Sequence, residues 1–376
     1  MDLIFLFFVG SFLLTYLVIP KIIKVVKYKR LLDEPNTRSS HTNVTPTLGG
    51  VAFFCTIIIG LFFLQRWDEN NVISALTTSL TVLFLVGLKD DLVAVSALAK
   101  ALIQVLAICF LLSNDSLVIS SLNGFLGVQE LNYYFSYIFS GFCVFYLINS
   151  YNLIDGIDGL ASSIGITILS IYSFVFYNTG NNFYFLFCII LISTLLAFLV
   201  YNFSEKKKIF MGDTGSMIIG FAIGFLTLKL LSLSEFSYSE NLGILPENTI
   251  ILIAAVLFIP FLDTLRVFLI RTLNKKSFFI ADTNHIHHVF LNMGYNHKKV
   301  TGIMVMINLI FAAVIFVLSM YLNSLLLLIS FAVMTIVFCL ILFYLNVNSK
   351  NTPESLNKIQ KSNFLNKFAS SILNQF

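Results

Sequence analysis

The chain opens with the stretch MDLIFLFFVGSFLLTYLVIP, residues 1–20, which holds a single charged residue and no basic one. About 20 consecutive apolar residues are the length that a helix needs to cross the hydrocarbon core of a bilayer. A secretory signal peptide would carry a basic N-terminal region and a small-residue cleavage site, and this stretch has neither. We therefore expect it to be a retained first membrane-spanning helix.

The composition of the whole chain is also that of a membrane protein. Of its 376 residues, 58% are hydrophobic and 11% are charged, whereas about 25% of residues are charged in soluble domains. This balance excludes a soluble globular enzyme, a disordered protein and a secreted disulfide scaffold. The apolar runs are long and continuous rather than alternating, which excludes a transmembrane β-barrel. The fold class is therefore an all-α, polytopic membrane helix bundle.

The apolar runs set the expected organisation of this bundle. We expect about eleven transmembrane helices, near residues 3–20, 49–65, 71–88, 98–113, 133–149, 160–177, 183–201, 216–233, 248–270, 300–320 and 324–345. Residues 1–346 would form an integral membrane domain. Residues 347–376 would form a cytoplasmic amphipathic tail, because apolar residues recur there at near-helical spacing with lysines between them.

The basic residues orient the bundle. Of the 23 Lys and Arg residues, all but Arg66 and Lys229 fall in one alternate set of segments, namely 21–48, 89–100, 202–215, 266–299 and the tail after 346. Cytoplasmic loops carry such an excess of basic residues. The pattern predicts that the N-terminus lies outside and the C-terminus in the cytoplasm.

Polar clusters at the ends of the expected spans are the candidate functional residues, since membrane proteins keep ionisable groups where they use them. Lys89, Asp90 and Asp91 end the third span, and Lys100 follows. Two adjacent carboxylates beside hydrocarbon repel each other, and a cation partner or a bound metal would offset this cost. The alternative is a solvated helix end that Lys89 neutralises.

The second cluster is NSYNLIDGIDGLA, residues 149–161, in which Asn149, Asn152, Asp155 and Asp158 recur every three residues. A glycine after each aspartate indicates a turn that leads into a helix. Backbone N–H groups at such a helix start attract phosphate, and carboxamide and carboxylate oxygens suit Mg2+. A hydrated loop with capping residues is the alternative.

Two further clusters complete the set. FMGDTGSM, residues 210–217, supplies Asp213 between two glycines, and a capped turn is its alternative. ADTNHIHHVF, residues 281–290, supplies three histidines, for which donors to an anionic or sugar ligand are favoured over a structural cluster. The histidine spacing is not the H-E-x-x-H of zinc sites. Together the four clusters suit Mg2+ and a diphosphate, as phosphoryl transfer requires.

With RSSHTNVTPTLGG (38–50) and PFLDTLRVFLIR (260–271), the clusters form an ordered series of motifs over most of the chain. The series resembles the polyprenyl-phosphate N-acetylhexosamine-1-phosphate transferase family. The H-x-H-H pattern within ADTNHIHH (281–288) is similar to the WecA/TagO-like branch of that family. The MraY branch instead has three consecutive histidines after a proline.

The resemblance implies a reaction, a cofactor and a location. N-acetylhexosamine-1-phosphate, with GlcNAc-1-phosphate as the default, would pass from a UDP-N-acetylhexosamine to undecaprenyl phosphate with release of UMP. The cofactor would be Mg2+, for which Mn2+ could substitute. The protein would be a multi-pass protein of the bacterial cytoplasmic (inner) membrane, with its active site on the cytoplasmic face. The reaction would initiate a lipid-linked surface glycan such as O-antigen or a teichoic acid linkage unit. Nucleic acid is not an expected partner, and the resemblance is compatible with a homodimer.

The resemblance also implies roles by position. Asn152 and Asp213 match the positions that hold Mg2+ against the diphosphate. Asp90 matches a carboxylate proposed as base on the lipid phosphate, or as nucleophile in its place, and Asp91 supports it. Asp155 and Asp158 match positions near the nucleotide and lipid phosphates. The residues that match substrate-binding positions are Lys100, Asn149, Arg271, His285, His287 and His288.

Two other interpretations remain. A MraY-type phospho-MurNAc-pentapeptide transferase shares the chemistry and differs in its sugar donor. A secondary transporter belongs to another class and would place ionisable residues near the membrane midplane within broken helices, often in repeated halves. The polar clusters here lie at span ends on one side, and no repeat is visible in the sequence. This arrangement favours the transferase.

Overall fold

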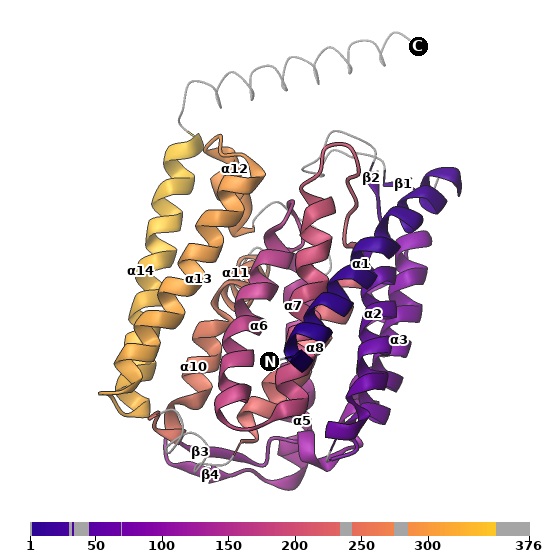
Figure 1. Ribbon diagram of the computed structural model, residues 1–376. Helices are drawn as coiled ribbons and strands as arrows, with labels where there is room; N and C mark the ends of the chain where they lie inside the picture. The colour runs from indigo at the N-terminus through magenta and orange to yellow at the C-terminus, as the bar shows by residue number, and fades with distance from the viewer. Residues whose placement is uncertain are drawn as a thin grey trace.

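The computed structural model describes residues 2–29, 32–33, 45–68, 70–233, 243–273 and 285–350. These residues form a bundle of helices with two short hairpins (Figure 1). In one hairpin, β1 (Leu32–Asp33) pairs with β2 (Thr45–Pro46), and in the other β3 (Ser121–Phe125) pairs with β4 (Val128–Glu130), both antiparallel. The described part of the chain is therefore nearly all helical, as expected.

Each predicted span falls on a helix, or on a pair of helices in one case. The helices are α1 (Asp2–Lys29), α2 (Gly49–Leu64), α3 (Val72–Leu92), α4 (Ala97–Leu112), α5 (Tyr133–Ile154), α6 (Leu160–Asn178), α7 (Asn182–Asn202), α8 (Gly212–Leu231), α10 (Thr249–Val256), α11 (Phe258–Leu273), α12 (Ile286–Asn292), α13 (His297–Ser319) and α14 (Ser324–Lys350). Short 3-10 turns lie at Gln65–Trp67, Asp115–Leu117 and Pro246–Asn248.

The expected count of eleven spans is not reached. Nine of the described helices are long and apolar enough to cross a membrane, or ten if the bent pair α10–α11 counts as one span. Helix α4 has only 16 residues, which is about 24 Å at about 1.5 Å per residue. That is shorter than the hydrocarbon core of about 30 Å. The expected span of 98–113 already had the same 16 residues, so this shortfall was present in the sequence.

The predicted span 248–270 is broken in its middle, and α10 and α11 meet at an angle of 73°. Pro260 has no N–H to donate to the carbonyl of Val256 four residues earlier. The side chain of Asn308 in α13 satisfies the backbone groups at the break. Its amide donates to Val256 O at 2.9 Å and accepts from Ile259 N at 3.0 Å. A broken backbone is tolerated at membrane depth where such a side chain satisfies it.

Helix α8 lies at the centre of the bundle, and nearly all of its residues are buried. Its first turn packs on α2 and α3 through glycines. A Cβ at Gly50 would lie 2.2 Å from Gly215 N, and a Cβ at Gly87 would lie 2.6 Å from Thr214 Cα. Only glycine allows backbones to approach this closely. The contact brings the start of α8 against the end of α3, where two of the four polar clusters meet.

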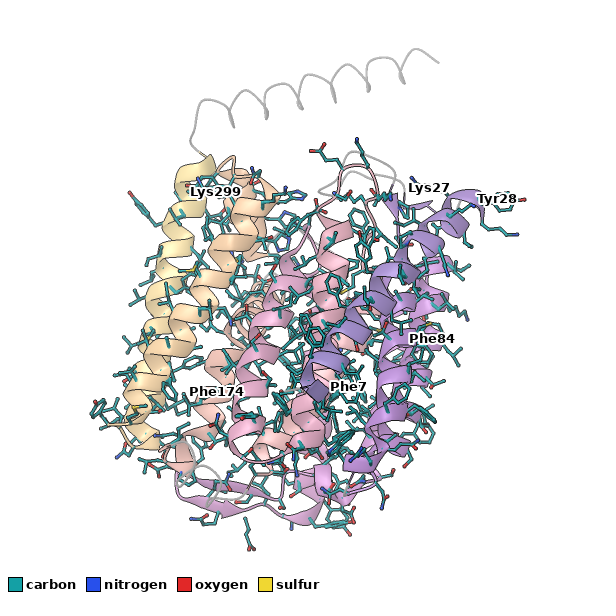
Figure 2. The ribbon with its side chains drawn as sticks, in the orientation of Figure 1. Phe7, Lys27, Tyr28, Phe84, Phe174 and Lys299 are labelled. Atoms are coloured by element: carbon teal, nitrogen blue, oxygen red, sulfur yellow. The ribbon has the colours of Figure 1, made fainter. Side chains whose placement is uncertain are left out.

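All four clusters lie at one end of the bundle, which we call the polar end. It carries residues 89–100, 149–161, 203–217 and 285–297, and in Figure 1 it is the end at which α12 lies. The hairpin β3–β4 lies at the opposite end. Figure 2 shows the exposed Lys27, Tyr28 and Lys299 at the polar end. Segments far apart in the sequence are thus gathered on one side.

Both ends of the chain depart from the expected boundaries. Helix α1 continues past the predicted span of 3–20 to Lys29, with Pro20 inside it. Helix α14 runs through Lys350, past the predicted end of the last span at 345. The expected amphipathic tail lies otherwise in residues 351–376, outside the described part of the chain, so it stays a prediction.

Candidate active site

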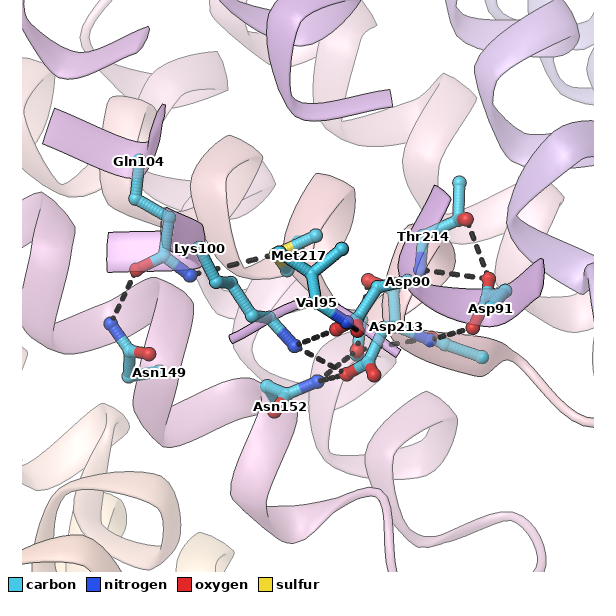
Figure 3. A network of polar contacts seen from close by, with 12 residues as sticks. Asp90, Asp91, Val95, Lys100, Gln104, Asn149, Asn152, Asp213, Thr214 and Met217 are labelled. Atoms are coloured by element: carbon cyan, nitrogen blue, oxygen red, sulfur yellow. Dashed lines mark hydrogen bonds and ion pairs between the residues drawn. The ribbon is translucent and has the colours of Figure 1, made fainter. Parts of the chain in front are cut away.

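The turn between α3 and α4 positions the first carboxylate of the site. Asp90 Oδ1 accepts a hydrogen bond from Val95 N at 2.7 Å, and Asp90 Oδ2 lies 2.9 Å from Lys100 Nζ (Figure 3). Ser96 caps α4 through its side chain, which accepts from Ala99 N at 3.3 Å. Asp90 therefore fixes the turn with one oxygen and holds Lys100 with the other.

Lys100 joins three helices. Its Nζ lies 2.8 Å from Asp213 Oδ1 in the first turn of α8. Asn152, in the last turn of α5, donates through Nδ2 to the same Asp213 oxygen and to Ser216 Oγ at 2.7 Å. We call Asp90, Lys100, Asn152 and Asp213 the carboxylate network. It brings together three of the sequence clusters around one ammonium group.

Asp91 is directed away from Lys100, toward the start of α8. Its Oδ1 accepts from Asp213 N at 2.7 Å, and its Oδ2 accepts from Thr214 N at 3.1 Å and Thr214 Oγ1 at 2.6 Å. A carboxylate here satisfies N–H groups that a helix start leaves unpaired and suits its dipole. Gly212, with φ of 73°, makes room, because a Cβ there would lie 2.7 Å from the Asp91 oxygens. Asp91 is a helix cap that positions Asp213.

Asn149 lies one turn before Asn152 on α5 and links this helix to α4 by a hydrogen bond. Its Nδ2 donates to Gln104 Oε1 at 3.0 Å and to Phe145 O at 2.8 Å. Gln104 is fully buried and its Nε2 contacts Met217 Sδ at 3.5 Å. Gln104 was missed in the sequence, although it is the one polar residue in the apolar run 101–112.

Asp155 and Asp158 lie on the loop between α5 and α6 and have opposite electrostatic environments. Burial, followed by the neighbouring carboxylates of Asp213, Asp91 and Asp158, raises the pKa of Asp155 to about 7. Burial alone would also raise the pKa of Asp158, but hydrogen bonds from His297 and Lys208 hold it below its usual value. Asp155 therefore lies beside the carboxylate network, and its charged neighbours there are other carboxylates. Asp158, in contrast, is an anion paired with His297 and Lys208.

The pair at Asp158 was not predicted. Its Oδ2 lies 2.6 Å from Lys208 Nζ and 2.9 Å from His297 Nδ1. Lys208 comes from the basic run 206–208, which the sequence assigns first to membrane topology and second to contact with a lipid or nucleotide phosphate. His297 begins α13. Its contact with Asp158 could not be predicted from the sequence, because the residues around His297 form no pattern with the other clusters.

The histidine segment, residues 285–288, is held by a buried aspartate, Asp263. In the sequence this residue stands out only as part of the motif PFLDTLRVFLIR (260–271). Asp263 of α11 is fully buried; its Oδ2 lies 2.8 Å from His285 Nδ1, and its Oδ1 accepts from Ile286 N at 2.7 Å. Asp263 thus caps α12 and fixes the ring of His285. His285 lies in the site region but is tied to this partner.

His287 is more enclosed than its neighbours. It is 1% exposed, and among the described residues neither of its ring nitrogens has a hydrogen-bond partner. Burial lowers the pKa of His287 to about 3, with Asp263 opposing the shift, so the ring is neutral. His288 is half-buried, and Arg271 is buried at the end of α11. Of the three predicted histidines, His288 is therefore the one most open to a ligand.

The donors at the carboxylate network fit Mg2+ in part. Asn152 uses its Nδ2 for Asp213 and Ser216, which leaves its carbonyl oxygen as a ligand. Asp213 Oδ2 and the Asp155 carboxylate are nearby oxygens, and their mutual repulsion is what a divalent cation offsets. The described residues contain no group of three or more His, Cys, Asp or Glu side chains able to hold a metal by themselves. Mg2+ takes one or two carboxylates and completes its shell with substrate phosphates and water.

The chain is similar in sequence to known proteins over most of its length. The sequence model described as "Glycosyl transferase family 4" matches residues 72–231, which include the whole carboxylate network. The chain is 30% identical over 306 residues to the "Probable undecaprenyl-phosphate N-acetylglucosaminyl 1-phosphate transferase" of Bacillus subtilis (strain 168), covering 80% of this chain and 81% of that protein. It is 27% identical over 295 residues to the "Undecaprenyl-phosphate alpha-N-acetylglucosaminyl 1-phosphate transferase" of Escherichia coli (strain K12), covering 77% of each. It is 29% identical over 285 residues to the "Decaprenyl-phosphate N-acetylglucosaminephosphotransferase" of Mycobacterium tuberculosis (strain ATCC 25618 / H37Rv), covering 71% and 70%.

Proposed function

The chain belongs to the polyprenyl-phosphate N-acetylhexosamine-1-phosphate transferase family, and from this premise we propose that it transfers GlcNAc-1-phosphate from UDP-GlcNAc to undecaprenyl phosphate. An oxygen of the lipid phosphate attacks the β-phosphorus of the donor, the bond to the α-phosphate breaks, and UMP leaves. The observation that carries the proposal is the single ammonium of Lys100, 2.9 Å from Asp90 and 2.8 Å from Asp213. Such a group can neutralise a phosphate while staying fixed by two carboxylates.

Each member of the carboxylate network has a separate task in this proposal. Lys100 binds the acceptor phosphate as a point charge. Asp90 holds Lys100 and lies next to the attacking phosphate, where it can take up the proton that this phosphate loses. Asp91 keeps the first turn of α8 in place, and so keeps Asp213 in place.

Asn152 and Asp213 would hold Mg2+, with Asp155 beside them. The cation would neutralise the diphosphate charge and polarise the phosphorus under attack. Without the cation, the carboxylate of Asp155 carries the repulsion of Asp213 and Asp91. A cation held by Asn152 and Asp213 would therefore relieve part of the charge repulsion at Asp155.

An apolar groove supports a polyprenyl acceptor. It has a volume of about 660 Å3 and lies between α4 and α5, lined by Val105, Ile108, Leu112, Ile138, Phe142 and Phe145. The same two helices carry Lys100 and Asn149 at the polar end. An isoprenoid chain in this groove would leave its phosphate at the level of Lys100. The groove ends at Val105 and Phe145, about one helical turn from Lys100 and Asn149 on the same two helices.

We further propose that the polar end faces the cytoplasm of a bacterial cell, where nucleotide sugars are available. The basic residues in loops at this end support that orientation. The product would be the first lipid-linked intermediate of a surface glycan. Arg271 and His288 would contact the sugar-phosphate of the donor, whereas His285 and His287 would shape the histidine segment that carries His288.

Release of UMP tests the proposal. Detergent-solubilised protein would receive Mg2+, undecaprenyl phosphate and one donor at a time: UDP-GlcNAc, UDP-GalNAc or UDP-MurNAc-pentapeptide. We expect UMP with UDP-GlcNAc, dependent on both Mg2+ and the lipid phosphate. UMP with the pentapeptide donor alone would move the chain to the MraY-type reaction. No UMP and no binding of any of the three donors would contradict the transferase.

A further inference from the structure

The loop between α5 and α6, residues 155–159, is supported by a segment that is distant in sequence. His297, the first residue of α13, places its Nδ1 2.9 Å from Asp158 Oδ2. One turn later, Thr301 Oγ1 donates to the carbonyl of Asp158 at 3.0 Å. Side chain and backbone of one residue are therefore both held by the first two turns of the same helix.

A second contact comes from α12, just before α13. A Cβ built at Gly156 would lie 2.6 Å from His287 Nε2 and 2.8 Å from His287 Cε1, so the imidazole packs directly on this glycine. The ring is itself almost fully buried. The segment from α12 to α13 thus touches the loop at Gly156 and at Asp158, on both sides of Ile157.

The other face of the loop is also fixed. Lys208 pairs with the same oxygen of Asp158 at 2.6 Å. Gly159 N donates to Asn202 Oδ1 at 2.6 Å, and Gly159 has φ of 76°, which suits glycine. The loop is held between α7 and its following loop on one side and α12–α13 on the other. Its near end joins directly to Asn152 and Asp155 of the candidate site.

We propose that His297 is a positioning residue for the transferase reaction: through Asp158 it holds loop 155–159 so that Asp155 and Asn152 face Asp213. The inference rests on the proposed function for its kinetic consequence, but the contact itself can be tested without turnover. His297 reaches no residue of the carboxylate network directly, since its polar contact is with Asp158. Its effect is therefore on the geometry of the loop and on the rate, rather than on the binding of the lipid.

The ring nitrogen that makes the contact suggests a rescue experiment. The Nδ2 of an asparagine occupies nearly the same place as histidine Nδ1, so His297→Asn keeps a donor to Asp158 and His297→Ala removes it. Lys299→Gln is the matched control: it lies in the same helical turn, and its Nζ lies 4.0 Å above the Tyr295 ring, away from Asp158. Each variant would be assayed for kcat and for the KM of both substrates.

We expect His297→Ala to lower kcat about 10- to 100-fold, the usual cost of losing an orienting partner behind a reacting group. The KM for undecaprenyl phosphate should stay within about twofold, because Lys100 is untouched. His297→Asn should recover kcat to within about threefold of the wild type, since its hydrogen bond remains. Lys299→Gln should match the wild type. Equal loss in the Ala and Asn variants, or none in Ala, would overturn the assignment.

Hydrogen exchange of the loop separates this inference from the proposed function. In the full-length protein in detergent, amides of residues 155–163 should exchange faster in His297→Ala than in His297→Asn and the wild type. Unchanged exchange in the alanine variant would refute the positioning role even if the enzyme were active. Should the wild type release no UMP with any donor, the proposed reaction fails, and the exchange result alone decides whether His297 holds the loop.

Discussion

The carboxylate network and the histidine segment are both conspicuous in the sequence, yet the fold uses them differently. In the network, Lys100 is shared between two carboxylates, and the side chain of Asp213 is 35% exposed. At the histidine segment, His285 is tied to the fully buried Asp263 of α11, and His287 is enclosed. The network can exchange its internal partners for a charged ligand, whereas most of the segment holds α11 and α12 together. Clustered polar residues therefore indicate a site region, but partners and exposure decide which residues act in it.

The substitution Asp213→Asn is expected to have the largest effect. It keeps the shape of the side chain but removes the charge that faces Lys100 and the expected cation. We predict a loss of kcat of about 1000-fold, in the range found when a preorganised charged group is removed from an active site. Steady-state assays at saturating Mg2+ would measure it. Full activity in a properly inserted variant would remove Asp213 from the site.

The matching change in the histidine segment is Asp263→Ala, and its effect should be on folding. Removing this buried acceptor leaves His285 Nδ1 and Ile286 N without their partner. We expect a loss of about 3 kcal/mol in stability, as for leaving buried donors without their charged hydrogen-bond acceptor. The thermal midpoint in detergent, with Asp158→Asn as a half-buried comparison, would measure it. A variant as stable as the wild type but inactive would place Asp263 in the chemistry instead.

Lys100→Ala should act mainly on the acceptor. Because Lys100 is proposed to bind the lipid phosphate, the KM for undecaprenyl phosphate should rise about 10- to 100-fold, the effect of losing about 1.4 to 2.8 kcal/mol. The KM for UDP-GlcNAc should change much less. Titration of the acceptor at fixed donor concentration measures both. An unchanged response to the lipid would contradict the assigned role.

The pKa of Asp155 gives a test that depends on pH. In the metal-free protein this pKa is raised to about 7, so the carboxyl is largely protonated below that pH. A nearby divalent cation favours the ionised form and lowers the pKa. Mg2+ binding should therefore release protons at about pH 6 and almost none at about pH 9. Calorimetry in buffers of different ionisation enthalpy would count them. Asp155→Asn should reduce the release, and an undiminished release would exclude Asp155 as its source.

The smallest effect is expected at His287. Its two buried ring nitrogens have no partner within the described residues, so the polar atoms contribute desolvation cost without a hydrogen bond. Replacement by leucine, of similar volume, should leave stability unchanged or raise it by about 1 kcal/mol. The KM for the donor should stay constant. A clear rise in that KM would show that His287 contacts substrate and would weaken the contrast between the two regions.

Much of the fold followed from hydropathy. Long apolar runs predicted the helices, because a backbone is stable in lipid only when its polar groups are hydrogen-bonded within the protein. The break between α10 and α11 did not follow, because it depends on Asn308, which is 48 residues beyond Pro260 in a different helix. Such a feature depends on tertiary partners that periodicity does not reveal.

The candidate site was predictable in its members but not in their contacts. The motifs named Asp90, Lys100, Asn152 and Asp213, and the fold places them together. The sequence could not tell that Asp91 points to the α8 start while its neighbour Asp90 points to Lys100, since that depends on how α3 meets α8. His297 and Asp263 were missed for the same reason. Their partners lie 139 and 22 residues away.

Transfer of the β-phosphorus of the donor tests the central claim most directly. Protein in detergent would receive Mg2+, undecaprenyl phosphate and UDP-GlcNAc labelled at the β-phosphate, with Asp213→Asn measured in parallel. The account predicts that the wild type moves the label into the organic-soluble lipid while unlabelled UMP stays in water, and that the variant, although inserted and folded, moves almost none. Label that remains in the water-soluble nucleotide, or equal transfer by the variant, would contradict a phosphotransferase site built around Lys100 and Asp213.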